Sequence, residues 1–390
     1  MSKGIRKEKR FVNETVCLAT SFMIIMLYAC ITPYEFSGMT GLRRILVVEG
    51  VITDSVTTVR LSRSVGLSDR LNDYVYVDNG MIFVECDDGT VSDTSRFAGL
   101  GNYHIITGDL NLSRKYRLRI LLDGEEYRSE FLQPMLTPDF ELSWVKEGDG
   151  AKVSIRISTR DTLGQSTFYL WSYMEDWEIK ARLLVDSFCI DSKWVFNDIF
   201  APDNRYWCWK TDSSRMFILG NVEGMTGHAI TNREIRSFFA SNERLSLLYH
   251  ISVKQHLIRK EAYKYYANMQ KNLEDIGSIF APIPSEIPGN LYCFTTPDIP
   301  VIGYVEVSTK SERRQFISAE EAYIESVYNE YDCSIEIPPG GYTPPQCFNT
   351  DRYQWVHYIN EKWIYNPQCV DCQAAGGTKN KPSWWPTSHL

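Results

Sequence analysis

From residue 42 onward the chain alternates between hydrophobic and polar positions in short runs separated by turn residues. The strand-like runs in the first part are 45–52, 57–64, 81–86, 116–122 and 125–131. Asp87-Asp88-Gly89 follows the third run, Asp123-Gly124 joins the last two, and Asp-Gly pairs between alternating segments favour hairpin turns. About seven strands within about ninety residues, without helical periodicity, predict an antiparallel β-sandwich.

The second part of the chain continues with strand patterns and then contains one helical pattern. Its strand-like runs are 140–145, 151–158, 168–179 and 244–253, and the last alternates through Leu245, Leu247, Tyr249, Ile251 and Val253. Apolar residues then recur at helical spacing, at positions 262, 266, 269, 273 and 276, before Gly277 and Pro282. This spacing predicts an amphipathic helix near 260–276.

These patterns predict a mainly β protein with two domains. An exported chain of about 360 residues exceeds the size of one ordinary hydrophobic core. Residues 42–136 are predicted to form an immunoglobulin-like or transthyretin-like β-sandwich. Residues 137–390 are predicted to form a larger β-rich domain with helical insertions.

The first thirty residues predict export and lipidation. Residues 1–10 contain five Lys or Arg, and residues 16–29 are mostly apolar but shorter than the roughly 20 residues that a membrane span needs. Leu27-Tyr28-Ala29-Cys30 resembles a bacterial lipobox, which makes residues 1–29 a lipoprotein signal peptide, Cys30 the acylated (palmitate-type) N-terminus and residues 30–41 a tether. A plain secretory signal cut near Ala29 and a buried N-terminal helix are the alternatives.

Loss of residues 1–29 makes the chain more acidic. It removes five basic and two acidic residues, so the formal net charge falls by three, from −8 to −11. This charge argues against nucleic acid and anionic lipid as partners. Membrane attachment is therefore expected through the lipid on Cys30.

The cysteines favour disulfides. Eight remain after Cys17 and Cys30 are set aside, and an even number in an exported chain suggests a disulfide framework whose pairing cannot be read from sequence. For the Cys369-x-x-Cys372 motif, a zinc ribbon would need a second such pair, which Cys333 and Cys347 do not supply. A redox pair would need to open a helix, and the flanking Pro and Gly residues leave little room for one. The motif is interpreted as structural: Cys369 and Cys372 are bonded either to each other or each to an outside partner, and Cys333 and Cys347 are the other disulfide candidates.

Tryptophans are the other candidate functional feature. Trp171 and Trp177 lie in one aromatic stretch, and Trp384 and Trp385 lie in the tail between two prolines. Exposed aromatics can bind sugars, peptides or a protein partner, whereas buried ones only stabilise a core. For the tail we expect one of Trp384 and Trp385 to pack onto the second domain, with the Cys369–Cys372 region holding it there.

Local signatures of catalysis are absent from the sequence. It contains no Gly-x-Ser-x-Gly elbow, no His-Glu-x-x-His motif and no Walker loop. His250 and His256 share a strand face and are a weak metal candidate beside the simpler interpretation of two separate strand histidines. Adjacent acidic pairs, at 87–88, 125–126 and 320–321, are interpreted as turns and solvated faces. We therefore expect no enzymatic activity, no cofactor and no metal.

Several segments together resemble a known family. They are Cys30, 46–54, 59–64, 261–290, 297–308 and the C-terminal segment that starts at Cys369. In this order they are similar to a Bacteroidota family of outer-membrane lipoproteins described only as a domain of unknown function, the DUF4249-type family. The resemblance implies a lipid-anchored protein, often encoded beside a TonB-dependent receptor, with no enzymatic activity assigned. It also implies outer-membrane localisation, with cell-surface exposure favoured and the periplasmic face as the alternative.

Three functions are compatible with these features. The first is a non-enzymatic binding or accessory partner of a TonB-dependent transporter in nutrient uptake, with an unidentified cargo. The second is a structural surface protein of the fimbrial type, which would need a donor strand shared between subunits. The third is a hydrolase of glycans or peptides, which ranks last because the sequence shows no nucleophile or metal constellation.

Overall fold

The computed structural model describes residues 45–64, 75–148, 152–161, 167–214, 217–224, 227–275, 289–322, 333, 354–358 and 361–386. The described residues from Leu46 onward belong to one compact unit. The predicted signal peptide, Cys30 and the tether lie outside the described residues, so these predictions stay predictions.

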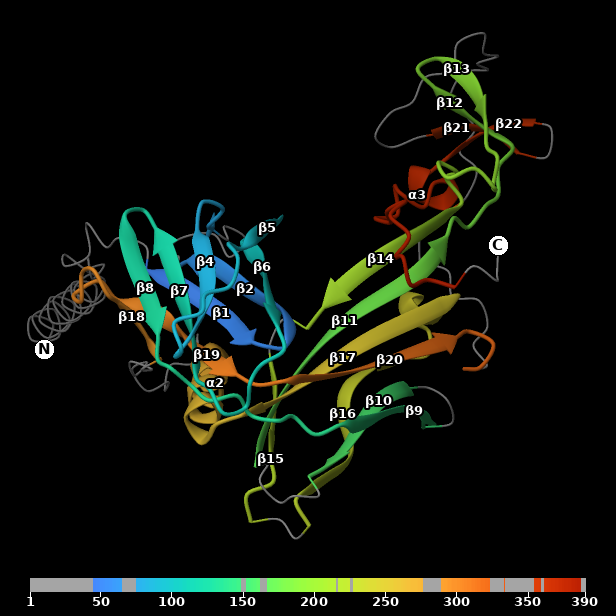
Figure 1. The fold of residues 1–390 in the computed structure, drawn as a ribbon. Coiled ribbons are helices and arrows are strands. Elements are labelled where there is room, and N and C mark those ends of the chain that lie inside the picture. The colour runs from blue at the N-terminus through green and yellow to red at the C-terminus, as the bar shows by residue number, and fades with distance from the viewer. Residues whose placement is uncertain are drawn as a thin grey trace, which may run out of the picture. The chain divides into compact units, whose positions relative to one another are not determined.

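The first part of this unit is a β-sandwich (Figure 1). Its six-stranded sheet has the order β19 (Val301–Val307), β1 (Leu46–Ile52), β2 (Ser55–Arg63), β6 (Asn102–Gly108) and β5 (Arg96–Gly99), with β3 (Val75–Tyr76) on β2. The four-stranded sheet has the order β18 (Leu291–Cys293), β8 (Glu125–Ser129), β7 (Tyr116–Leu122) and β4 (Met81–Cys86). Alternate residues such as Val59, Leu61, Leu118 and Ile120 are buried between the sheets.

Two strands of this sandwich come from much later in the chain. β19 pairs in parallel with β1, from Leu46 opposite Val301 to Ile52 opposite Val307, and β18 pairs antiparallel with β8. The predicted boundary at residue 136 stays a prediction. The sheets built from residues 46–129, however, also contain residues 291–307, which the division into 42–136 and 137–390 did not anticipate.

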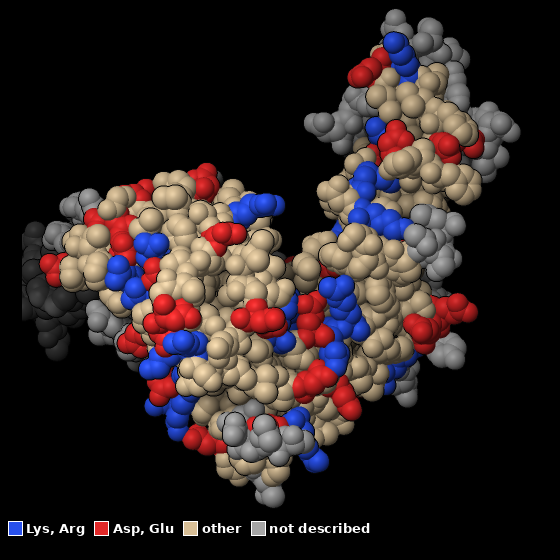
Figure 2. Space-filling model, in the orientation of Figure 1, with Lys and Arg blue, Asp and Glu red and all other residues tan. Residues whose placement is uncertain are grey.

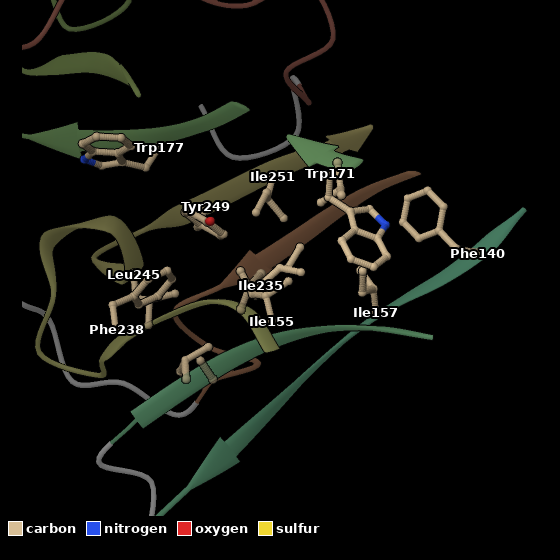
Figure 3. Packing of buried hydrophobic residues seen from close by; sticks show 14 of the residues in the cluster. Phe140, Ile155, Ile157, Trp171, Trp177, Ile235, Phe238, Leu245, Tyr249 and Ile251 are labelled. Atoms are coloured by element: carbon tan, nitrogen blue, oxygen red, sulfur yellow. The ribbon is translucent and has the colours of Figure 1, made fainter. Parts of the chain in front are cut away.

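A second pair of sheets encloses the largest core. The five-stranded sheet, called the central sheet below, contains β14 (Trp207–Ser213), β11 (Phe168–Lys180), β17 (Leu248–Ile258) and β20 (Lys310–Ser318), with β15 (Ile218–Asn221) on β11. The facing three-stranded sheet contains β16 (Ala229–Phe239), β10 (Lys152–Arg160) and β9 (Phe140–Glu147). Figure 3 shows Ile155 and Ile157 of β10 packed with Ile251, Tyr249 and Trp171 between these sheets.

A separate four-stranded sheet follows β11 in the chain and is called the small sheet. Its order is β13 (Lys193–Phe196), β12 (Ser187–Ile190), β21 (Gln354–Tyr358) and β22 (Glu361–Tyr365). Phe188, Val356, Cys369 and Val370 form its buried cluster. Its strands therefore come from two regions of sequence about 160 residues apart. The short helix α3 (Pro367–Val370) follows β22 and contributes Cys369 and Val370 to this cluster.

The predicted helix is present as α2 (Lys260–Asp275). Ala262 and Tyr266 are buried and Met269 packs beside them, as the spacing predicts, while the side chain of Leu273 and residue Ile276 lie outside the described residues. The helix has no Ser or Thr cap at its start. Instead, the buried carboxylate of Glu306 accepts a 2.9 Å hydrogen bond from the backbone N–H of Arg259 and pairs with its guanidinium.

One predicted strand begins later than its pattern indicated. β17 starts at Leu248, whereas residues Glu243–Leu245 form the 3₁₀ turn η1, so the prediction of a strand over 244–247 was wrong. The side chain of Asn242 accepts a hydrogen bond from the N–H of Arg244, which favours a turn over an extended chain. Leu245 is still buried, so its apolar character reflects the core rather than a strand.

The mainly β fold class, with an immunoglobulin-like β-sandwich followed by a larger β-rich region, is confirmed. Among the described helices, none combines the length and the apolar composition that crossing a bilayer requires. On the face drawn in Figure 2, basic and acidic side chains are interspersed, with broad uncharged areas between them.

Candidate functional site

The Cys369-x-x-Cys372 motif is held by two disulfides that reach outside it. Cys369 is bonded to Cys333, and Cys372 is bonded to Cys208 on β14. The disulfide interpretation is therefore confirmed in the form where each cysteine has an outside partner. Because both sulfurs are used, this pair is not a zinc half-site or a redox centre.

The other cysteines fall into three groups. Cys189 is also disulfide-bonded, whereas Cys86 and Cys293 are free thiols buried in the four-stranded sheet of the first sandwich. The fourth sequence candidate, Cys347, lies outside the described residues. Because Cys86 and Cys293 are buried, their thiols are protected from oxidation, and two free cysteines are compatible with an exported protein that contains disulfides.

Residues Cys369–Cys372, called the clasp below, are anchored to the loop that follows the small sheet's β13. The N–H of Cys372 donates to the carbonyl of Arg205 at 2.9 Å, and the Arg205 guanidinium pairs with Asp371 at 2.9 Å. At the other end of this loop, the buried Asn197 donates to the carbonyl of Val185 at 3.0 Å and accepts from the N–H of Arg205 at 3.2 Å. The loop 197–206 is therefore fixed by buried hydrogen bonds and an ion pair.

The tail after the clasp continues along the edge of the central sheet. Thr378 and Trp209 exchange two backbone hydrogen bonds, of 2.8 and 2.9 Å. A Cβ at Gly377 would lie 2.5 Å from the Cβ of Cys208, so a residue without a side chain is needed beside the Cys208–Cys372 disulfide. The tail is thereby held against β14.

Trp385 is the tail indole that packs onto the fold. Only 3% of it is exposed, and its ring lies 5.7 Å from that of Phe316 and 6.4 Å from that of His250. Trp384 is 39% exposed and lies under the guanidinium of Arg314, 5.4 Å from its ring centre. The two neighbouring candidates therefore differ: Trp385 is a core residue, and Trp384 is available at the surface.

Trp171 and Trp177 belong to the core rather than to a binding surface. Trp171 is fully buried, stacks on Tyr169 and donates its indole N–H to Gln255 at 2.8 Å. Trp177 is buried beneath the guanidinium of Arg244, at 4.3 Å from the ring centre. The core interpretation, which the sequence left open, applies to both.

An exposed apolar surface lies on the small sheet and its anchored loop. Phe196 at the end of β13 is 75% exposed, and Phe200 in the loop is 80% exposed. Leu184 and Val195 are 44% and 45% exposed, and Val195, the strand neighbour of Phe196, points to the opposite face of the small sheet. Among the described strands of the small sheet, β13 lies at an edge, so the backbone N–H and C=O groups on its outer side are accessible beside the apolar side chains. We call Phe196 and Phe200 the apolar surface.

A small cavity adjoins this surface. It has a volume of about 240 Å³ and is lined by Phe200, Pro202, Trp209, Lys379, Lys381 and their loop neighbours. The ammonium groups of Lys379 and Lys381 lie 6.0 and 5.8 Å from the centre of the Trp209 ring. Burial lowers the pKa of Lys379, and Asp371 and Asp203 offset part of that effect. An apolar contact surface with two cations at its border suits a protein partner with apolar and acidic groups.

His250 and His256 do not form a joint metal site. Both lie on the same face of β17, as predicted, but six residues along a strand correspond to about 20 Å. His250 lies 3.2 Å from Asp176 through Nδ1, whereas His256 is near Ser308. Among the described residues no group of three or more His, Cys, Asp or Glu is placed to hold a metal ion.

The buried carboxylates do not form a facing pair of the glycosidase type. Glu175 is bound by Arg236 at 2.8 Å, by Arg244 at 3.2 Å and by the hydroxyl of Tyr249 at 2.7 Å. Asp176 is its neighbour on β11, so the two side chains point to opposite faces of the sheet. The adjacent acidic pairs at 87–88 and 320–321 lie at exposed turns, as predicted, and Thr90 hydrogen bonds lower the pKa of Asp88 to about 2. The pair at 125–126 instead begins strand β8 and is half-buried, and Glu125 accepts a 2.9 Å hydrogen bond from the hydroxyl of Thr296.

Phe196 and Phe200 were not predicted from the sequence as exposed residues. A phenylalanine in a short strand-like segment indicates burial by default, because burial of aromatic residues is the common case. Asp198 and Pro202 are turn residues on either side of Phe200 and place it in a loop. They do not, however, reveal that the loop is anchored with its phenylalanine exposed.

Comparison with known proteins identifies a family without an assigned function. The family described as "Domain of unknown function (DUF4249)" matches residues 31–314. This match covers both sandwiches and ends within β20, so β21, β22, the clasp and the tail lie beyond it.

A solved structure shows only a distant similarity to this chain. The two fibronectin type-III domain segment from chicken tenascin is similar at 8% sequence identity, with 55% of this chain and 91% of that chain covered and a TM-score of 0.17. A TM-score this low supports no inference about fold or function. No curated protein matches this chain.

Proposed function

The chain belongs to the DUF4249 family, and from that premise we propose that it is a non-enzymatic lipoprotein of the outer membrane that acts as a binding partner of a TonB-dependent transporter in nutrient uptake. In this proposal the lipid on Cys30 holds the protein at the membrane. The apolar surface of the small sheet contacts the transporter.

The observation that carries the proposal is the pair of exposed phenylalanines, Phe196 and Phe200, on an anchored frame. Single exposed apolar residues are ordinary, but two phenylalanines four residues apart that are 75% and 80% exposed favour an interaction surface. The loop that carries Phe200 is fixed by Asn197, Arg205 and the clasp, so binding would order little additional chain. Aromatic side chains of this kind commonly supply most of the binding energy of an interface.

The alternative of a fimbrial subunit finds less support in the sheets. A shared donor strand needs a vacant position beside a sandwich strand. The positions beside β1 and β8 are filled by β19 and β18 of the same chain. The alternative of a glycan hydrolase would need two carboxylates that face each other across a cleft. Glu175 and Asp176 are buried neighbours on β11, but their side chains point to opposite faces of the sheet.

The experiment is affinity purification from detergent-solubilised membranes at native expression. The wild type should bring down a large outer-membrane β-barrel protein, and Phe196→Ser with Phe200→Ser should reduce its recovery at least about tenfold. The matched control is Phe239→Ser at the end of β16, since Phe239 is 72% exposed and lies outside the apolar surface.

Two results would contradict the proposal. One is a wild type that elutes without any β-barrel partner. The other is a partner whose recovery falls equally in the Phe239 control, because that would indicate a general effect of surface polarity.

A further inference from the structure

A second cavity lies between the outward face of the first sandwich and the central sheet. It has a volume of about 310 Å³. One wall is formed by β1, β2 and β6. In the strand register, Glu49 of β1 lies opposite Arg60 of β2, and Arg60 lies opposite Asn102 of β6. Since neighbouring residues of these strands fill the sandwich core, strand alternation directs these three side chains outward.

The opposite wall is a row of polar residues on one face of the central sheet. Ser172 of β11 is opposite Lys254 of β17, and His256 of β17 is opposite Lys310 of β20. The other face of β17, with Tyr249, Ile251 and Val253, fills the large core. Strand alternation therefore places Lys254 and His256 together in the cavity wall.

The rest of the lining combines apolar and hydroxyl groups. Val51, Leu170 and Phe217 belong both to the lining and to the hydrophobic cluster beneath helix α2. Hydroxyl groups come from Thr58, Ser172, Ser213 and Ser214. The cavity thus offers an apolar patch and several hydrogen-bonding groups as well as charges, which is typical of small-molecule sites.

The charges of the lining are unbalanced. Arg60, Lys254 and Lys310 are three cations of the lining, and none forms an ion pair within 4.0 Å with a carboxylate of the described residues. Two further carboxylates lie beside the lining: Glu312 is opposite Lys254 on β20, and Asp54 accepts a 2.9 Å hydrogen bond from the backbone N–H of Lys310. Glu49 is the acidic residue of the lining, and burial raises its pKa, with Arg60 opposing that rise. Three cations against one carboxylate in the lining itself favour an anionic ligand.

We propose that this cavity binds an anionic sugar, meaning a monosaccharide-sized ligand that carries a carboxylate or a phosphoryl group beside several hydroxyls. Arg60, Lys254 and Lys310 bind the charged group. Glu49, Asn102 and the serine hydroxyls hydrogen bond the sugar hydroxyls, and the apolar patch contacts the C–H face of the ring. This ligand site goes beyond the proposed partnership with a transporter and does not depend on it.

The test is isothermal titration calorimetry on the purified full-length protein in detergent. The probes are D-galacturonate, D-glucose 6-phosphate, D-galactose and inorganic phosphate. The proposal predicts that at least one acidic sugar binds about tenfold or more tightly than both galactose and inorganic phosphate. The first two probes distinguish a carboxylate ligand from a phosphoryl ligand.

Variants on opposite walls test the location of the site. Lys254→Met with Lys310→Met, and separately Arg60→Gln, should each weaken binding of the acidic sugar at least about tenfold. Lys115→Met, at an exposed lysine of the first sandwich, should leave it unchanged, and thermal unfolding of each variant establishes that it folds. The proposal is overturned by equal binding of galactose, by equal binding of inorganic phosphate, or by variants on both walls that bind as the wild type does.

Discussion

Cys208 on β14 is bonded to Cys372, 164 residues later, and this disulfide joins the central sheet to the clasp at the start of the tail. Both cysteines are fully buried, and Trp209, directly after Cys208, pairs through its backbone with Thr378, six residues after Cys372. The disulfide therefore fixes the direction of the tail, which ends with Trp385 in contact with Phe316 and the β17 histidine His250.

Removal of this disulfide should destabilise the protein strongly. Cys208→Ala with Cys372→Ala opens a loop of 164 residues, for which chain entropy predicts a loss of about 5 kcal/mol in the free energy of unfolding. The matched control, Cys333→Ala with Cys369→Ala, opens a loop of 36 residues and should cost less. Denaturant unfolding under non-reducing conditions measures both, and an equal or larger loss in the control would refute this account of the clasp.

The two tail tryptophans should differ in their effect on stability. Trp385→Ala should lower the free energy of unfolding by about 3–5 kcal/mol, because a large buried side chain is lost and a cavity remains. Trp384→Ala should cost less than about 1 kcal/mol, because that side chain is partly exposed. Urea unfolding of the two variants is the measurement. Similar losses in both would mean that the tail does not dock through Trp385.

His256 should make the protein less stable in acid. Burial, together with the nearby Lys254 and Lys310, lowers the pKa of His256 to about 4, against an ordinary value of 6.5. The unfolded chain therefore binds more protons between these values, so the stabilisation is complete above pH 6.5 and is lost as the pH falls towards 4. The loss is on the order of 3 kcal/mol.

Unfolding free energies measured from pH 7 to pH 4 test this dependence. His256→Gln should flatten the decline between pH 6.5 and 4, whereas His104→Gln, at an exposed histidine, should leave it as in the wild type. An unchanged slope in the His256 variant would show that the acid sensitivity has another source.

The lipid anchor gives a prediction for cell fractionation. Cys30→Ser should abolish incorporation of labelled palmitate and release the protein from the outer-membrane fraction, because the acyl chains supply the membrane affinity. Cys17→Ser, within the predicted signal peptide, should change neither result. A Cys30 variant that stays in the outer-membrane fraction, with a wild type that never takes up palmitate, would show that the lipobox interpretation is wrong.

Local features of the fold could be predicted closely from the sequence. The strand over 116–122 and its turn into the next strand are found as predicted, and Asp123 and Gly124 both have positive φ values, of 52° and 82°. A tight hairpin of this kind is determined by neighbouring residues. The same holds for α2, whose apolar spacing and boundaries are local.

Non-local features could not be predicted. The parallel pairing of β19 with β1 joins residues more than 250 positions apart, and no local pattern distinguishes it from other partners of an apolar strand. The partners of Cys369 and Cys372 are set by the folded sheets, in agreement with the many pairings that eight cysteines allow. Exposure of Phe196 and Phe200 likewise depends on how the loop is anchored.

The central claim is that the apolar surface contacts a transporter, and site-specific photo-crosslinking tests it most directly. A photoreactive phenylalanine analogue is placed at Phe196 in one strain and at Phe239, equally exposed on β16, in another. After irradiation of intact cells, the account predicts an adduct between position 196 and an outer-membrane TonB-dependent transporter, and none from position 239. An adduct from position 239 alone, or none from either position, would contradict it.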